Sequence, residues 1–225
     1  MALPFTTSKN IALVIVDIQY DFLENGPLPV QKSSDILPHV IKLIHKVKAE
    51  NGFIIATQDW HPKDHKSFAS NHENKKPFVD SVELVYHGVT SQQTLWPDHC
   101  IQGSEGAKIV SELVPYIDDT VHKGTNPYID SYSGFADNQY HSFTPLAKKL
   151  YEKNVDCLVI CGLATDYCIK YTCIDAVKFG FKTYLVSDAT EAVVPQDKLK
   201  TFAELEAQGV QIVTTAECIQ TQHKK

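Results

Sequence analysis

The chain has 225 residues, of which 43% are hydrophobic and 21% charged, so it can bury the core of a single α/β domain. Its formal net charge of -6 disfavours nucleic acid and anionic membranes as partners. The sequence contains 21 lysines and no arginine. Without the bidentate arginine fork, a neutral or weakly charged ligand fits better than a dicarboxylate.

Six apolar segments predict the strands of one sheet. The first, 11-IALVIV-16, is a continuous apolar run of the kind found in strands that are buried on both faces. Further along the chain, strands are predicted at 53–57, 117–123, 156–162, 182–187 and 210–213.

Helical segments alternate with these strands. After Ser33-Ser34, a candidate N-cap pair, the segment 35–50 has apolar residues at helical spacing and stops at Asn51-Gly52. Further helices are predicted near 105–114, 143–153, 165–179 and 196–208. This alternation predicts an α/β fold in one domain, 1–225: a Rossmann-like, doubly wound, mostly parallel six-stranded sheet with helices on both faces.

The segment 58–103 interrupts the alternation. It is rich in His, Asn, Pro, Asp and Lys and has no clear periodicity. A loop of this length in a compact domain is usually functional or disordered, and its aromatic and histidine content favours function. We therefore predict a loop insertion at about 58–103 that carries a binding site.

The start of the chain and the cysteines indicate the compartment. MALPFTTSKN lacks a basic start followed by a long apolar run, and no segment reaches membrane-spanning length. We therefore expect a cytoplasmic protein, with access to the nucleus left open. Thiols stay reduced there, and the six cysteines form no CxxC pair, so disulfides are not expected.

Several reactive side chains follow the predicted strands: Asp17, Asp59, His61, Lys123 and Cys168. Taken singly, such residues are more often caps, turn residues or solvated charges. However, ligands of an open parallel sheet bind beyond the carboxyl ends of its strands, near the point where strand order reverses. The convergence of these five side chains on that edge of the sheet favours a functional site.

Asp59 and His61 form the first candidate group. Residues two apart in an extended segment point to the same side, so an oxygen and a nitrogen can face one ion, and His99 offers a third ligand. Three such ligands suit a divalent metal with open coordination positions, Zn²⁺ first and Fe²⁺ or Mn²⁺ as alternatives. His65 and His72 lie close enough in sequence to compete for the role.

Asp17, Lys123 and Cys168 form the second candidate group. Thr165 is a candidate N-cap that places Cys168 in the first turn of the helix. We expect the helix N-terminus and Lys123 to lower the pKa of the thiol, and Asp17 to accept its proton. By contrast, Cys157, Cys161 and Cys173 are expected to be core residues.

Five blocks of the sequence resemble the signature blocks of the nicotinamidases, within the isochorismatase-like cysteine hydrolases. They are DIQYDF, QDWHP with DHKSFASNH, LWPDHCIQGSEGA, HKGTNPYIDSYSGF and CGLATDYC. The resemblance runs from about residue 11 to 215, and five blocks in the right order are far more specific than any one alone.

The resemblance implies roles for individual residues. Asp17, Lys123 and Cys168 match the catalytic triad, and Asp59, His61 and His99 match the metal ligands. His65 matches a histidine that is associated with the metal in only some members. The positions that wall the ring pocket correspond to Phe22, Trp96, Tyr132 and Tyr167. The backbone N–H groups of Ala164 and Cys168 match an oxyanion hole, which usually follows a cis peptide bond, here Leu163-Ala164.

The resemblance also implies an activity. The family hydrolyses nicotinamide to nicotinate and ammonia through a cysteine thioester, in NAD salvage, which makes it an amidohydrolase of linear amides. Two alternatives stay open: another isochorismatase-like amidase, with or without a metal, and a non-catalytic, zinc-stabilised binding protein. Whether the protein forms a homo-oligomer is also left open.

Overall fold

The computed structural model describes residues 8 and 10–220. Its centre is a six-stranded sheet with the order β5-β2-β1-β6-β7-β8, in which every neighbouring pair is parallel. The strands are β1 (Ile11–Val16), β2 (Phe53–Asp59), β5 (Asp119–Lys123), β6 (Cys157–Leu163), β7 (Lys182–Glu191) and β8 (Gln211–Val213). The predicted parallel α/β sheet is therefore confirmed.

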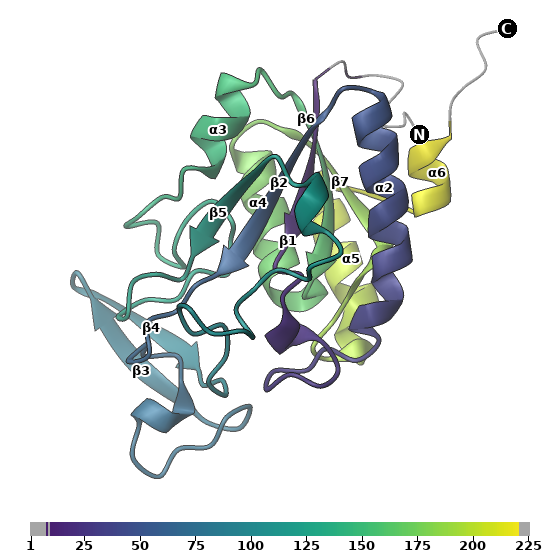
Figure 1. The fold of residues 1–225 in the computed structure, drawn as a ribbon. Coiled ribbons are helices and arrows are strands. Elements are labelled where there is room, and N and C mark those ends of the chain that lie inside the picture. The colour runs from purple at the N-terminus through teal and green to yellow at the C-terminus, as the bar shows by residue number, and fades with distance from the viewer. Residues whose placement is uncertain (1–7, 9, 221–225) are drawn as a thin grey trace, which may run out of the picture.

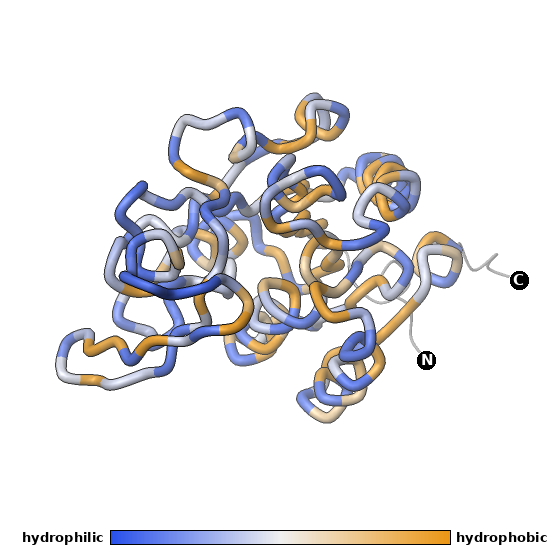
Figure 2. Tube along the Cα trace, turned by 90° about the horizontal axis from the view of Figure 1, so that it is seen from below, coloured by the Kyte–Doolittle hydropathy of each residue, from blue (hydrophilic) through white to orange (hydrophobic). Residues whose placement is uncertain are grey.

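Helices cover both faces of this sheet (Figure 1). One face carries α2 (Leu37–Ala49) and α6 (Thr215–Ile219), and the other carries α3 (Leu146–Glu152), α4 (Lys170–Lys178) and α5 (Lys198–Ala207). Alternate residues of β1 point to opposite faces of the sheet. Leu13 packs in the core with α2, and Val14 packs in the core with α3, α4 and α5. Figure 2 shows hydrophobic segments mostly in the interior of the molecule and hydrophilic segments mostly around the outside. None of the described helices is long and apolar enough to span a membrane.

Two predicted helices differ in the structure. Residues 105–114 are not helical: this segment forms turns, and Ile109 bridges to Gln19 beside the end of β1. Ser33 and Ser34 do not cap α2, because they lie in a 3₁₀ turn and Ile36 is the N-cap. The predicted end at Asn51-Gly52 is confirmed, with Asn51 at a φ of 56°. The short 3₁₀ turns are Tyr20–Phe22, Ser33–Ile36, Ala69–Asn71, Val114–Tyr116 and Pro195–Asp197.

The segment 58–103 contains a hairpin that the sequence analysis did not predict. Its strands are β3 (Ser81–Tyr86) and β4 (Val89–Thr94), joined by His87 and Gly88, both with positive φ. It lies beyond the carboxyl ends of β2 and β5, at the lower left of Figure 1. The hairpin was missed because only β3 alternates, with Val82, Leu84 and Tyr86 half-buried, whereas β4 is almost entirely polar and shows no apolar alternation.

Candidate active site

The site lies at the carboxyl ends of four adjacent strands. Strand order reverses between β1 and β6, which is where open α/β sheets bind ligands. Asp17 follows β1 directly, Asp59 and Lys123 are the paired last residues of β2 and β5, and Cys168 lies in a π-helical turn, Thr165–Ile169, after β6. The predicted convergence of these side chains is therefore present in the structure.

Lys123 is the centre of one group. Its side chain is almost fully buried, and its Nζ lies 2.8 Å from Asp17 Oδ2 and 2.6 Å from Asp59 Oδ1. The same ammonium donates to Cys168 Sγ at 3.2 Å and to the carbonyl of Ser131 at 3.0 Å. One lysine thus links the candidate base, the candidate nucleophile and a candidate metal ligand.

The charges around Lys123 affect one another. Burial alone would lower the pKa of Lys123, but Asp17 and Asp59 outweigh it and raise the pKa well above the ordinary value, so the ammonium stays charged. Burial raises the pKa of Asp17, opposed by Lys123 and by the Thr57 hydroxyl, which donates to Asp17 Oδ1 at 2.6 Å. A carboxyl group with a raised pKa is a stronger base when it is ionised.

The expected lowering of the Cys168 pKa is wrong for the resting protein. Burial raises this pKa well above its ordinary range, and the charge of Lys123 only partly opposes the effect. The thiol also hydrogen-bonds to Asp17, which favours the protonated form. The nucleophile is therefore held as a thiol beside its base, and sulfur becomes charged only when the proton leaves.

The turn that carries Cys168 is built differently from the predicted helix start. Thr165 is not the N-cap: its hydroxyl is buried against that of Thr190 in β7, at 2.8 Å, and Ala164 occupies the cap position without a side-chain bond. The peptide bond between Leu163 and Ala164 is cis, as expected from the resemblance. Cys168 still lies in the first turn, so its predicted place is confirmed.

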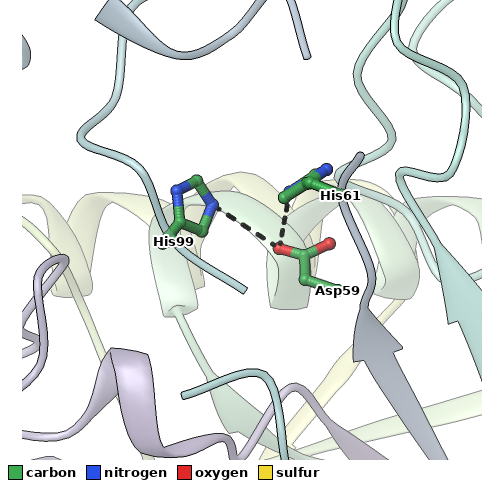
Figure 3. A group of neighbouring side chains, drawn as sticks. All are labelled: Asp59, His61 and His99. Carbon is green, nitrogen blue, oxygen red and sulfur yellow. Dashed lines mark ion pairs between the residues drawn. The ribbon is translucent and has the colours of Figure 1, made fainter. Parts of the chain in front are cut away.

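The candidate metal ligands face one another (Figure 3). Asp59 Oδ2 lies 3.5 Å from His61 Nε2 and 4.0 Å from His99 Nε2, and all three residues are buried. The Nδ1 atoms of the two histidines lie 2.8 Å from the carbonyls of Gly124 and Pro97, respectively. With Nδ1–H donating to a carbonyl, each Nε2 keeps its lone pair for an ion, so the donor set fits a divalent metal.

Gly124 makes room for this arrangement. It has a φ of +64°, and a Cβ built there would lie 2.3 Å from His61 Cε1. The His61 ring therefore lies directly against the backbone that follows β5. A side chain at position 124 would displace a candidate metal ligand.

The protonation of the three ligands follows from their mutual contacts. Burial raises the pKa of Asp59, but Lys123 and His61 outweigh it and lower the pKa, so Asp59 is ionised. Burial and the charge of His61 lower the pKa of His99 to about 4, so His99 is neutral. Burial lowers the pKa of His61 as well, but Asp59 outweighs it and raises the pKa.

Of the two other candidate ligands, His65 and His72, only His65 lies with this group. It is fully buried, its ring centroid is 4.4 Å from that of His61, and its Nε2 has no hydrogen-bond partner among the described residues. Its Nδ1 lies 2.7 Å from the Ser67 hydroxyl. His72 instead bonds to the carbonyl of Lys66 at 2.8 Å and belongs to none of the potential ligand groups.

A pocket opens over both groups. Its lining includes all four predicted wall residues, Phe22, Trp96, Tyr132 and Tyr167, together with Ala164 and Cys168. The Tyr132 hydroxyl accepts hydrogen bonds from Trp96 Nε1 and Gln93 Nε2, both at 3.2 Å. These bonds fix the orientation of two ring walls, so the pocket suits a small planar ligand.

Three lining residues were not predicted from the sequence: Leu28, Asp130 and Val193. Asp130 is the notable one, because it is a buried carboxylate whose oxygens accept from Ser131 N–H at 2.7 Å and from Gln93 Nε2 at 3.3 Å. It lies in an irregular stretch seven residues after the end of β5. A search limited to residues next to strand ends could not find it.

Comparisons with known proteins agree with this geometry. The isochorismatase domain family matches residues 11–217. A nicotinamidase of Escherichia coli (strain K12) is 39% identical over 216 residues, which are 94% of this chain and 98% of that protein.

Solved structures give the same result. The structure of an Acinetobacter baumanii nicotinamidase and pyrazinamidase superposes with a TM-score of 0.85 at 36% identity, covering 94% of this chain and 99% of that one. The structure of a Pyrococcus horikoshii pyrazinamidase in complex with zinc gives a TM-score of 0.75 at 35% identity, covering 91% and 99% of the two chains.

Proposed function

The chain belongs to the isochorismatase family and, within it, to the nicotinamidases, and we propose that it hydrolyses nicotinamide to nicotinate and ammonia in NAD salvage. One observation carries the proposal. Lys123 Nζ contacts the carboxylate of Asp17 and the sulfur of Cys168, at 2.8 and 3.2 Å, beneath a pocket walled by aromatic rings. Acyl transfer requires such a nucleophile, base and cation within hydrogen-bond reach of one another.

In the first half of the proposed reaction, Cys168 attacks the carboxamide carbon. Its thiol proton passes to Asp17 as the carbon–sulfur bond forms, and the ammonium of Lys123 stabilises the charge that develops on sulfur. The backbone N–H groups of Ala164 and Cys168 are proposed to bind the oxyanion. Asp17 then returns the proton to the leaving nitrogen, the carbon–nitrogen bond breaks, and ammonia departs from a thioester.

In the second half, water replaces ammonia. Asp17, ionised again, takes a proton from the attacking water as the new carbon–oxygen bond forms. The carbon–sulfur bond breaks, and the Cys168 sulfur recovers its proton from Asp17. The product acid loses its proton to solvent and leaves as nicotinate, and the thiol and carboxylate return to their starting states.

We propose that Asp59, His61 and His99 hold a divalent metal, with Zn²⁺ first and Fe²⁺ or Mn²⁺ as alternatives. One support is that backbone carbonyls orient the rings of His61 and His99, which leaves the Nε2 atom of each ring for the metal. The other support is the zinc complex of the similar pyrazinamidase. When bound, the metal would supply a Lewis acid for the pyridine nitrogen and so orient the ring. His65, with its free Nε2, is a candidate fourth ligand.

The proposal is tested by measuring ammonia release from nicotinamide with purified protein. We expect turnover that falls strongly after chelation and returns when Zn²⁺, Fe²⁺ or Mn²⁺ is added back separately, which also ranks the metals. Undiminished turnover in metal-free protein would remove the ring-orienting role. No ammonia from nicotinamide, but release from another amide, would favour a different amidase of the family.

A binding protein without catalysis would behave differently. It would have a closed site and an inert Cys168 that iodoacetamide does not label, whereas we expect Cys168 to be labelled and nicotinamide to block the labelling. The cytoplasmic location stays a prediction, and whether the protein forms a homo-oligomer stays open.

A further inference from the structure

Gln19 is a buried side chain beside the candidate metal ligand Asp59. It lies two residues after Asp17 and is fully enclosed. Its Oε1 accepts from the backbone N–H of Asp59 at 2.8 Å, and its Nε2 donates to the carbonyl of Asp59 at 2.9 Å. The second Nε2 proton goes to the carbonyl of Ala107 at 2.8 Å. Both amide protons of Gln19 are thus hydrogen-bonded, and two of its three hydrogen bonds hold the backbone of Asp59.

These bonds continue the sheet after β1 has ended. The β1–β2 pairing runs as far as Val16 and Thr57, and Asp17 then turns away with a φ of 47°. The side-chain amide of Gln19 presents to Asp59 the same donor and acceptor that a neighbouring strand would present. On its other side, Asp59 pairs with Lys123 of β5. The backbone of Asp59 is therefore held from both sides.

The placement of Asp59 matters because its two oxygens have different partners. Oδ1 accepts from Lys123 Nζ at 2.6 Å, and Oδ2 faces His61 and His99. A rotation or shift of this carboxylate would disturb both groups at once. Hydrogen-bond partners outside the ligand shell commonly change metal affinity by about 10- to 100-fold when they are lost.

We propose that Gln19 is a positioning residue that sets Asp59 for metal binding. The inference rests on the metal role given to Asp59 in the proposed function, and it concerns only the residues of this chain. It predicts that removing the Gln19 amide weakens metal binding, even though Gln19 bonds to Asp59 only through the Asp59 backbone and does not itself line the pocket.

Gln58 provides a matched control. It is also a glutamine, is 9% exposed, and donates through Nε2 to the same Ala107 carbonyl, at 2.6 Å. This side-chain bond goes to Ala107 and not to Asp59. If Gln19 served only to tie the 101–110 segment to the sheet, loss of either amide would have the same effect.

The test measures zinc affinity at equilibrium, by competition with a chromophoric chelator, in full-length protein without substrate. Gln19→Met keeps the side-chain volume and removes the three bonds. Gln19→Glu keeps the acceptor for Asp59 N–H and serves if the first variant fails to fold. We expect both to bind zinc at least about tenfold more weakly than wild type, and Gln58→Met to stay within about threefold.

Other outcomes would overturn the inference. Wild-type affinity in both Gln19 variants, equal weakening in Gln19→Met and Gln58→Met, or no zinc binding by the wild type would each do so. Because the measurement uses no substrate, its result is separate from that of the proposed function. Failure to release ammonia from nicotinamide would leave the Gln19 result standing.

Discussion

Cys168 differs from Cys161 and Cys173 in what its sulfur contacts. Only Cys168 lines the pocket and lies near Lys123, whereas the other two are fully buried in the core. We expect Cys168→Ala to lower ammonia release from nicotinamide by a factor of at least about 10³ while metal content is retained. Cys161→Ala and Cys173→Ala should stay active and lose roughly 1 kcal/mol of unfolding free energy. Equal activity losses in all three variants would contradict the assignment.

The protonation state of Cys168 leads to a second prediction at this scale. Burial raises the pKa of its thiol above the ordinary value of 9.0, despite Lys123. The rate of alkylation by iodoacetamide should therefore keep rising with pH through 9 in metal-free protein, since only the thiolate reacts. Mass spectrometry of the modified peptide measures this rate, with Cys168→Ala as the control. A rate that levels off below pH 8 would mean a preformed thiolate.

Single residues at strand ends could be predicted from the sequence, but their pKa values could not. Asp17, Asp59 and Lys123 were found because the carboxyl ends of parallel strands meet at one edge. The pKa of Cys168 was misjudged because the sequence shows the helix start and the cation but not the depth of burial, which has the larger effect.

At the scale of elements, Asp166 joins the turn after β6 to the segment after β7. Its two carboxylate oxygens accept from the backbone N–H groups of Val193 and Val194, at 2.9 and 3.0 Å, and Val193 lines the pocket. Asp166→Ala should raise KM for nicotinamide more than it lowers kcat, because the pocket wall loosens. It should also lower the unfolding free energy by roughly 1–3 kcal/mol.

Asp197 is the control for that prediction. It is an exposed acid that raises the pKa of Asp166 through its charge, and it does not line the pocket. Asp197→Ala removes one negative charge, as Asp166→Ala does, but it leaves the two hydrogen bonds of Asp166 intact. Steady-state kinetics and urea unfolding should show little change for it, and matching changes in the two variants would point to charge rather than to the bonds.

Elements with strong apolar periodicity were predictable, and those stabilised by irregular contacts were not. The run 11–16 is buried on both faces and was placed correctly. Residues 105–114 have helical composition, yet their backbone bonds to the segment after β1, as in Val110 N–H to the Ile18 carbonyl at 3.0 Å. Such tertiary contacts override local propensity and leave no periodic signal. The division into one domain with an insertion at 58–103 stays a prediction.

At the scale of the whole molecule, the site depends on the complete sheet. Asp17, Asp59, Lys123 and Cys168 come from the ends of four strands that are joined only through the order β5-β2-β1-β6. Enclosing these groups takes them out of water, so burial is the largest single influence on each of their pKa values, although the neighbouring charges together outweigh it for Asp59 and Lys123. The stability of the fold should therefore depend on pH through its buried site.

His65 allows this dependence to be measured. Burial lowers its pKa to about 4, from 6.5 in the unfolded chain. Between these values the unfolded state binds the proton and the folded state does not, so stability from this residue is present above pH 6.5 and is lost as pH falls toward 4. The full loss is on the order of 3 kcal/mol. His61 and Asp17, whose pKa values are raised, act in the opposite direction, so a single variant must isolate the effect.

His65→Asn in metal-free protein provides that comparison. Urea unfolding of wild type and variant at pH 7, 6 and 5 should show the wild type losing more stability than the variant as pH falls, because only the wild type must bury a neutral imidazole. The contribution of Asp17 is shared by both proteins and cancels in the difference, whereas the charge of His61, which also lowers the pKa of His65, is part of the effect measured. A stability difference that stays constant from pH 7 to 5 would mean that the buried His65 titrates as it does in water.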